Sequence, residues 1–138
     1  MNNSLERIIR NLMCGHETPL IISKNELSSV RFCVEDYKEQ FKKLVEDGGE
    51  WVRCHWAILT FLDAVIGAEL PLYEFELDYI IAQAHSKHLL LQEMAIDMLE
   101  SLDDPNFLEK IEDVRVLNYY IQKQLEEMKK DWRERLNG

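Results

Sequence analysis

The sequence predicts an all-α fold, and three observations support this prediction. Apolar residues recur with a period close to 3.6 along almost the whole chain, which is the signature of amphipathic helices. No run of useful length alternates apolar and polar residues with a period of two. Only five glycines and three prolines occur in 138 residues, which leaves little room for hairpins or long loops. This length predicts a single domain, residues 1–138, that buries about two thirds of the surface of its unfolded chain.

Capping signals divide the N-terminal third into two predicted helices. Asn3 and Glu6 have the spacing of a capping box, and the first helix should end near Gly15. Ser23 and Glu26 form a second box at the start of one long predicted helix. Its apolar stripe consists of Leu27, Val30, Val34, Tyr37, Phe41 and Leu44. Gly48-Gly49 should end this helix, because glycine readily adopts the left-handed conformation.

The middle of the chain predicts two further helices. The apolar face of the first consists of Trp51, His55, Ile58, Leu62 and Val65, and this helix should end at Gly67. Pro71 suits the first turn of the next helix, because that turn does not need its N–H. The apolar face expected for this helix consists of Leu72, Phe75, Tyr79 and Ala82.

The C-terminal part predicts a helix capped by Ser86 and a last helical segment that begins at Asp104-Pro105 as N-cap and first turn. The inner face of the former consists of Leu91, Met94, Ala95, Met98 and Leu102. The last segment keeps the period through Leu108, Ile111, Val114, Leu117, Ile121, Leu125, Met128 and Trp132. A break is expected near Asp113.

A weak internal repeat of about forty residues accompanies this periodicity. A shift of 38 places residues 56–61 over residues 94–99, and a shift of 40 places residues 77–81 over residues 117–121. Helical hairpins that cannot bury their own apolar faces are completed by stacking on similar neighbours. The alternative is an ordinary helical bundle whose periodicity arises by chance.

Two short motifs resemble those of HEAT-type helical repeats. Residues 51–57, with Val52-Arg53 and Ala57, are similar to the V-R-x-x-A-A start of such repeats, and residues 99–105 are similar to their L-x-x-L-x-D-P corner. The resemblance implies a short α-solenoid of about six helices in stacked antiparallel hairpins. Residues 1–47 would form a divergent first hairpin, and residues 48–84 and 85–136 would form two related ones.

Negative charge is concentrated in the middle of the chain. Residues 60–113 contain thirteen carboxylates and two bases, a formal charge of −11, whereas the whole chain carries −10. Such a field repels itself in a compact fold but attracts cationic partners quickly. The acidic balance argues against binding to nucleic acid, which needs a basic surface.

Several other classes of protein fit the sequence poorly. No apolar run approaches the ~20 residues needed to span a bilayer, and residues 1–7 lack the layout of a signal peptide. A cytoplasmic protein that does not bind membranes is therefore expected. The chain has an odd number of cysteines, Cys14, Cys33 and Cys54, and no two of them have the CxxC spacing. We therefore expect structural thiols and no disulfide framework.

We expect neither catalysis nor a cofactor. His85 and His88 lack a third zinc ligand nearby, so no metal site is predicted. Cys14-Gly15-His16 fits an interhelical loop better than a nucleophile and its base. His55 fits a hydrogen-bonded core position, and no carboxylate pair stands out in an apolar setting.

The acidic stretch is instead the candidate binding surface. Glu93, Asp97, Glu100 and Asp104 have a 4-3-4 spacing and should share one helix face. Tyrosines nearby are candidate interface anchors, although one of Tyr119 and Tyr120 is expected in the core. The remaining predicted partner-binding residues are Glu74, Asp78, Glu109, Glu112, Asp113 and Tyr73. The competing interpretation is a merely solvated face, although such faces usually mix both signs of charge.

The functional hypothesis is therefore a non-catalytic module that binds a basic protein, as a monomer or a homodimer. In size, acidity and helix content the chain resembles small bacterial immunity proteins, which block a cognate toxin that is often a cationic nuclease. This resemblance implies that the carboxylates cover the toxin's phosphate-binding surface. The alternative is a structural adaptor or subunit that binds a peptide or helix in an apolar groove. A third possibility is an enzyme of unrecognised type that uses Glu or His residues. The basic stretch 129–135 could pair with the acidic region of a second copy in a homodimer.

Overall fold

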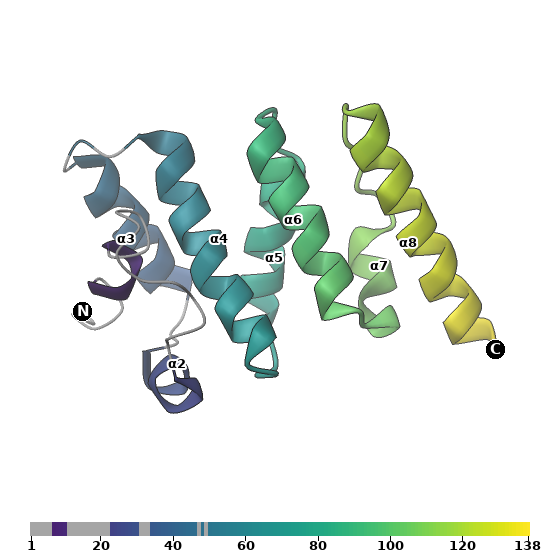
Figure 1. Ribbon diagram of the computed structural model, residues 1–138, viewed down its shortest axis with the longest axis horizontal. Helices are drawn as coiled ribbons and strands as arrows, with labels where there is room; N and C mark the ends of the chain where they lie inside the picture. The colour runs from purple at the N-terminus through teal and green to yellow at the C-terminus, as the bar shows by residue number, and fades with distance from the viewer. Residues whose placement is uncertain (1–6, 11–22, 31–33, 47, 49) are drawn as a thin grey trace. The chain divides into compact units, whose positions relative to one another are not determined.

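The protein is all-helical in its computed structural model, which describes residues 7–10, 23–30, 34–46, 48 and 50–138 (Figure 1). No strand occurs in these residues. The chain divides into two compact units, Met1–Leu77 and Asp78–Gly138, and the boundary falls inside one helix. That boundary also lies inside the predicted hairpin 48–84, and the division into repeats stays a prediction.

The N-terminal unit contains α2 (Lys24–Val30), α3 (Val34–Glu46), α4 (Trp51–Gly67) and the beginning of α5 (Glu74–Ala84). The capping residue predicted for α2 is confirmed, because the N–H of Glu26 donates to Ser23 Oγ at 3.1 Å. In place of the single long helix predicted from Ser23, the structure has two helices, α2 and α3. Residues 31–33 between them lie outside the described part of the chain, as do the predicted start of the first helix and the loop 16–22.

Helix α4 has the predicted bounds, and Gly48 before it has a φ of +86°, as expected for a helix-ending glycine. Ile58, Leu62 and Val65 are fully buried on its predicted apolar face. Trp51 departs from that prediction and is 50% exposed, because it is the first residue of the helix. Its ring packs edge-on against that of His55, with ring centroids 4.4 Å apart.

Two details of α5 differ from the sequence prediction. Pro71 precedes the helix, which begins only at Glu74. The buried residues of the helix are Glu76, Leu77, Ile80, Gln83 and Ala84, whereas the predicted stripe is only half-buried or, at Ala82, exposed. This face includes two buried polar residues, Glu76 and Gln83, which a pattern of apolar residues does not mark.

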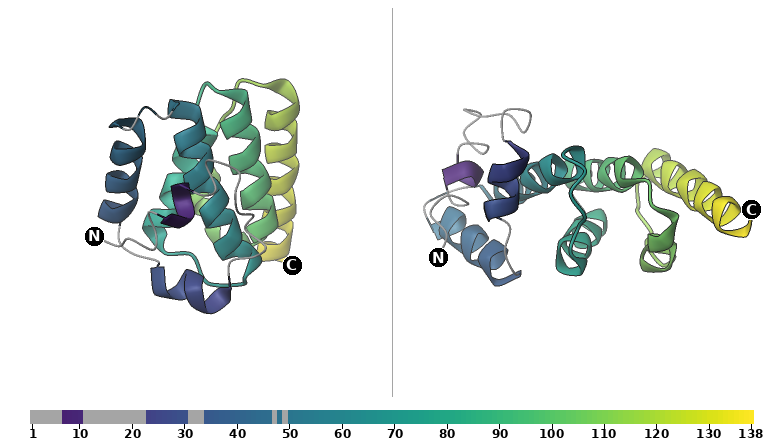
Figure 2. Two further views of the ribbon diagram at one scale, coloured as in Figure 1. Left: turned by 60° about the vertical axis from the view of Figure 1, so that its left-hand side comes forward. Right: turned by 90° about the horizontal axis from the view of Figure 1, so that it is seen from below.

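The C-terminal unit contains the rest of α5, α6 (Leu89–Leu102), the 3-10 turn η2 (Pro105–Phe107), α7 (Leu108–Ile111) and α8 (Tyr119–Asn137). Helices α6 and α8 lie side by side and run in the same direction, and α7 lies on one side of this pair (Figures 1 and 2). The break predicted near Asp113 is confirmed by the loop between α7 and α8.

Capping explains the ends of these helices. Asp104 accepts from the N–H of Asn106 at 3.0 Å and precedes Pro105, as predicted. Ser86 does not cap α6, because the N-cap position of this helix is His88. The hydroxyl of Ser86 instead accepts a hydrogen bond from the N–H of His88 at 3.1 Å, before the helix begins. Asn118 caps α8 by accepting from two N–H groups, those of Tyr120 and Ile121.

The apolar period places most of the expected core residues of this unit inside. The buried apolar residues are Ile80, Ala84, Leu91, Ala95, Ile96, Met98, Leu99, Ile111, Val114, Val116, Ile121, Leu125, Met128 and Trp132. Leu117 is the clear exception, because it lies in the loop before α8 and is 89% exposed. The apolar period of the last segment included Leu117 as if one helix continued through it, but α7 ends before this residue and α8 begins after it.

Candidate protein-binding surface

The outer side of α6 displays three carboxylates, Glu93, Asp97 and Glu100, which together we term the acidic face. All three are exposed, whereas Leu91, Ala95 and neighbouring residues on the opposite side are buried. Their spacing of four and three residues brings them onto one side of the helix. Within the described residues none of them forms an ion pair with Lys or Arg. The predicted outward display is therefore observed for this part of the acidic stretch.

A glutamine from α8 joins two carboxylates of the acidic face. Gln124 Nε2 donates to Asp97 Oδ1 at 2.8 Å and to Glu100 Oε2 at 3.2 Å. An amide is neutral, so these hydrogen bonds orient the carboxylates without cancelling their charge. The acidic face thus keeps its negative field while its geometry is held by the neighbouring helix.

The same side of α8 extends the surface in both directions. Tyr120 lies one turn before Gln124, and Glu127 lies one turn after it, at spacings that put all three on one side of the helix. Tyr120 and Glu127 are both exposed. The sequence prediction did not include Gln124 and Glu127. Their spacing, four residues from Tyr120 to Gln124 and three more to Glu127, already places them on the same helix side as that predicted residue.

Both tyrosines at the start of α8 face solvent. Tyr119 is 70% exposed and Tyr120 is 79% exposed, so the prediction that one of them lies in the core is wrong. Their rings pack edge to face with centroids 5.4 Å apart. Because the core side of α8 begins at Ile121, the two preceding residues project away from it. With Leu117 they form an exposed apolar cluster at the entrance to the helix.

Three other predicted binding residues interact with neighbouring groups of the protein. Asp78 pairs with Lys110 at 3.2 Å, and Glu112 pairs with Arg133 at 2.7 Å. Asp104 is half-buried and serves as the cap of η2. These three carboxylates therefore contribute less to an outward negative field than the sequence suggested.

The remaining predicted residues do not all belong to one unit. Glu109 and Asp113 are exposed in and just after α7, in the C-terminal unit. Tyr73 and Glu74 are exposed at the start of α5 and belong to the N-terminal unit, where the ring of Tyr73 packs against Phe75 with centroids 5.6 Å apart. The acidic face therefore rests on residues of the C-terminal unit alone.

One carboxylate of the acidic stretch is fully buried. Glu76 accepts a hydrogen bond from the hydroxyl of Tyr37 at 2.8 Å and another from the N–H of Tyr73 at 2.9 Å. It thereby fixes the loop before α5 against α3, within the N-terminal unit. Counting charges along the sequence cannot distinguish this structural carboxylate from a displayed one.

The histidines and the described cysteine were also candidates for chemistry. His55 is half-buried between Phe41 and Trp51, and burial lowers its pKa to about 4. His85 and His88 are exposed before α6. Cys54 is buried, and burial, followed by the charge of Glu50, raises the pKa of its thiol. Cys14, His16 and Cys33 lie outside the described residues.

Neither a metal site nor a membrane-spanning helix is found in the described residues. No group of three or more His, Cys, Asp or Glu side chains is arranged there to hold a metal ion. None of the helices in the same residues is both long enough and apolar enough to cross a membrane.

Compared with models of known protein families, with curated proteins and with solved structures, the chain shows no match.

Proposed function

We propose that this chain is a non-catalytic binding protein that receives a basic protein on the acidic face of α6. The observation that carries the proposal is the exposure of Glu93, Asp97 and Glu100 on one side of a helix without a cationic partner among the described residues. Like charges at such spacings destabilise an isolated helix by about 0.2–0.5 kcal/mol for each pair. A cationic partner would remove this cost on binding.

The surroundings of the acidic face suit a protein partner better than a small cation. Tyr120 and Glu127 extend the surface along α8, and tyrosine is enriched at the energetic centres of protein interfaces. A basic partner would be drawn in by the field and then held by contacts to the aromatic rings. Electrostatic steering of this kind raises association rates to ~10⁸–10⁹ M⁻¹s⁻¹ at low salt.

The more specific form of the proposal is an inhibitor of a basic toxin. A cationic nuclease binds phosphates through Lys and Arg, and a surface of carboxylates can occupy those same groups. The support is the chemical complementarity of the acidic face and the resemblance in size, charge and helix content to immunity proteins. The stacked HEAT-like arrangement remains part of this proposal.

A charge-reversal experiment with a matched control tests the acidic face. The test variant carries Glu93→Lys, Asp97→Lys and Glu100→Lys. The control carries Glu39→Lys, Glu46→Lys and Glu50→Lys, three exposed carboxylates of the N-terminal unit. Both variants have the same net charge, so a difference between them reports the position of the charge.

The readout is the set of basic proteins captured from the source cell, followed by association rates with the purified partner at low and high salt. We expect wild type and control to capture the same basic protein, and the test variant to lose it. The proposal fails if both variants capture it equally. Inhibition is then tested by measuring the partner's own activity with and without this protein.

A second candidate function is an adaptor that binds a peptide or helix through apolar contacts. The exposed cluster of Leu117, Tyr119 and Tyr120 favours it, because large apolar side chains gathered at one place often mark interaction sites. This candidate predicts binding that survives high salt and is lost in the variant Tyr119→Ser, Tyr120→Ser. High salt therefore distinguishes the two functions, because it weakens binding through charges and leaves apolar binding intact.

A further inference from the structure

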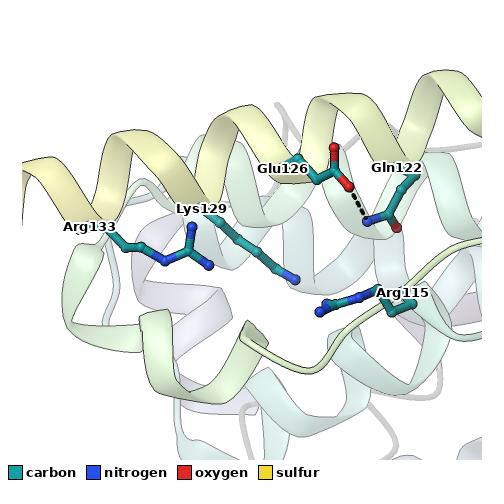
Figure 3. A pocket seen from close by; sticks show the side chains of 5 residues that line it. All are labelled: Arg115, Gln122, Glu126, Lys129 and Arg133. Atoms are coloured by element: carbon teal, nitrogen blue, oxygen red, sulfur yellow. Dashed lines mark hydrogen bonds between the residues drawn. The ribbon is translucent and has the colours of Figure 1, made fainter.

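A second charged site of opposite sign lies in the C-terminal unit. A pocket of about 220 Å³ is lined by Arg115, Gln122, Glu126, Lys129 and Arg133, from α8 and the loop that precedes it (Figure 3). We term it the cationic pocket. The four α8 residues are spaced by four, three and four, so they share one side of the helix.

Two of its cations are fixed by the same backbone carbonyls. Lys129 is only 3% exposed, and its ammonium donates to the carbonyl oxygens of Glu112 and Val114, both at 2.9 Å. Arg115 Nη1 donates to the same two oxygens, again at 2.9 Å. Because they share both acceptors, the two head groups are held close together. Figure 3 shows them pointing toward each other, with the guanidinium of Arg133 directed toward Lys129.

The positive charge of the pocket exceeds the negative charge around it. Three cations line the pocket with one carboxylate, that of Glu126, which accepts from Gln122 at 3.2 Å. Glu112 pairs with Arg133, so even with this second carboxylate one positive charge remains. Burial lowers the pKa of Lys129, and the neighbouring charge of Arg115 lowers it further.

Donors remain for a ligand after the contacts within the protein. An ammonium has three N–H donors and a guanidinium has five. Lys129 uses two donors on carbonyls, and the second terminal nitrogen and Nε of Arg115 have no acceptor in the described part of the chain. At ~30 Å³ for each water, the pocket has room for several waters, but it falls short of the ~300 Å³ typical of a drug-sized ligand site.

We propose that the cationic pocket binds a phosphoryl group, either as inorganic phosphate or as the phosphate of a small phosphomonoester. A phosphoryl group is an anion with three strong acceptor oxygens, which matches the N–H donors of the three cationic groups that line the pocket. A carboxylate offers one charge and two oxygens. This site is independent of the acidic face and extends beyond the function proposed for it.

The test is calorimetric titration of the whole protein with inorganic phosphate, O-phosphoserine and acetate at constant ionic strength. We expect saturable binding of phosphate or phosphoserine, and the tighter of the two identifies the source of the group. Arg115→Gln and Arg133→Gln should each weaken this binding about tenfold or more, because each removes charged hydrogen bonds. Lys129 is left intact, since it is buried and its loss would also remove one of the two donors on each of the carbonyls of Glu112 and Val114.

Lys130→Gln is the matched control. It removes the same charge from the neighbouring residue of α8, which is exposed and does not line the pocket. The proposal is overturned if wild type shows no saturable binding of either phosphate ligand, if acetate binds as tightly, or if the control loses as much affinity as Arg133→Gln. Circular dichroism confirms that each variant is folded; if Arg115→Gln is not, Arg133→Gln decides.

Discussion

The two sides of α8 carry charge in opposite ways. One side, through Gln124, meets the acidic face, whose carboxylates lie in solvent and form no ion pair within the described residues. The other side forms the cationic pocket, where Lys129 is buried on two carbonyls and Arg133 is paired with Glu112. Gln122 and Gln124 differ by two positions, or about 200° around the helix, which separates the two sides.

This difference separates charge that is displayed from charge that is part of the fold. A displayed charge interacts weakly with its own protein but acts on partners over about one Debye length. A buried cation bonded to carbonyls supports the backbone and acts only on a ligand that enters its pocket. We therefore expect substitutions on the two sides to differ first in stability.

The largest effect should follow loss of the buried ammonium. Lys129→Met keeps an unbranched side chain, one atom shorter, but leaves the carbonyls of Glu112 and Val114 without this donor, and Arg115 alone remains on them. We expect the free energy of unfolding to fall by about 2–3 kcal/mol in urea denaturation. Lys130→Met, on the exposed neighbour, should change it by less than about 0.5 kcal/mol. Equal effects would mean that Lys129 is not part of the fold.

The stability of the fold should also depend on pH through the half-buried His55. Its pKa is about 4 in the fold against 6.5 in the unfolded chain, so the folded state favours the neutral ring. As the pH falls from 6.5 toward 4, the unfolded state takes up a proton that the folded state does not, and stability is lost. Allowing for partial exposure of the ring, this loss should be about 1–2 kcal/mol.

The measurement is urea denaturation as a function of pH for wild type and His55→Phe, which keeps an aromatic ring between Phe41 and Trp51. Burial raises the pKa of Asp63 on the same helix, so this carboxyl stabilises the fold as the pH falls and opposes the effect of His55. The difference between wild type and variant isolates the histidine. Parallel curves for the two proteins would contradict an embedded His55.

The cap of α8 supports both sides of the helix. Asn118→Ala removes the acceptor of two N–H groups, at 3.0 and 3.1 Å, and should cost about 1 kcal/mol of unfolding free energy. Asn118→Asp keeps the acceptor and should preserve stability. Fraying of the first turn would also move Tyr119 and Tyr120, so partner capture should weaken in the alanine variant and be normal in the aspartate variant.

The smallest effect on stability should come from the acidic face itself. Reversal of Glu93, Asp97 and Glu100 should change the unfolding free energy by no more than about 0.5 kcal/mol, since exposed charges contribute little. The same variant should lose its partner, as proposed above. A large loss of stability would show that these carboxylates are structural and would remove the distinction between the two sides of α8.

The sequence predicted part of this surface because helical spacing is a local property. Glu93, Asp97 and Glu100 could be placed together from their spacing alone, and the burial of Ile121, Leu125, Met128 and Trp132 followed from the same period. Lys129 could have been noticed as well, because it follows Leu125 by four residues. A lysine there predicts either a half-exposed stem or a buried cation, and spacing does not choose between them.

What the sequence alone determined is the helical class, several helix ends and the concentration of negative charge. Each of these depends on residues close together in the chain, through capping, proline and glycine geometry, and a repeat of 3.6. Only the tertiary structure decided which charges are displayed, which are paired and which are buried. Asp78 and Lys110 are far apart in sequence, as are Lys129 and the carbonyls that it caps. A charge acquires its role from neighbours brought by folding, and no local pattern contains them.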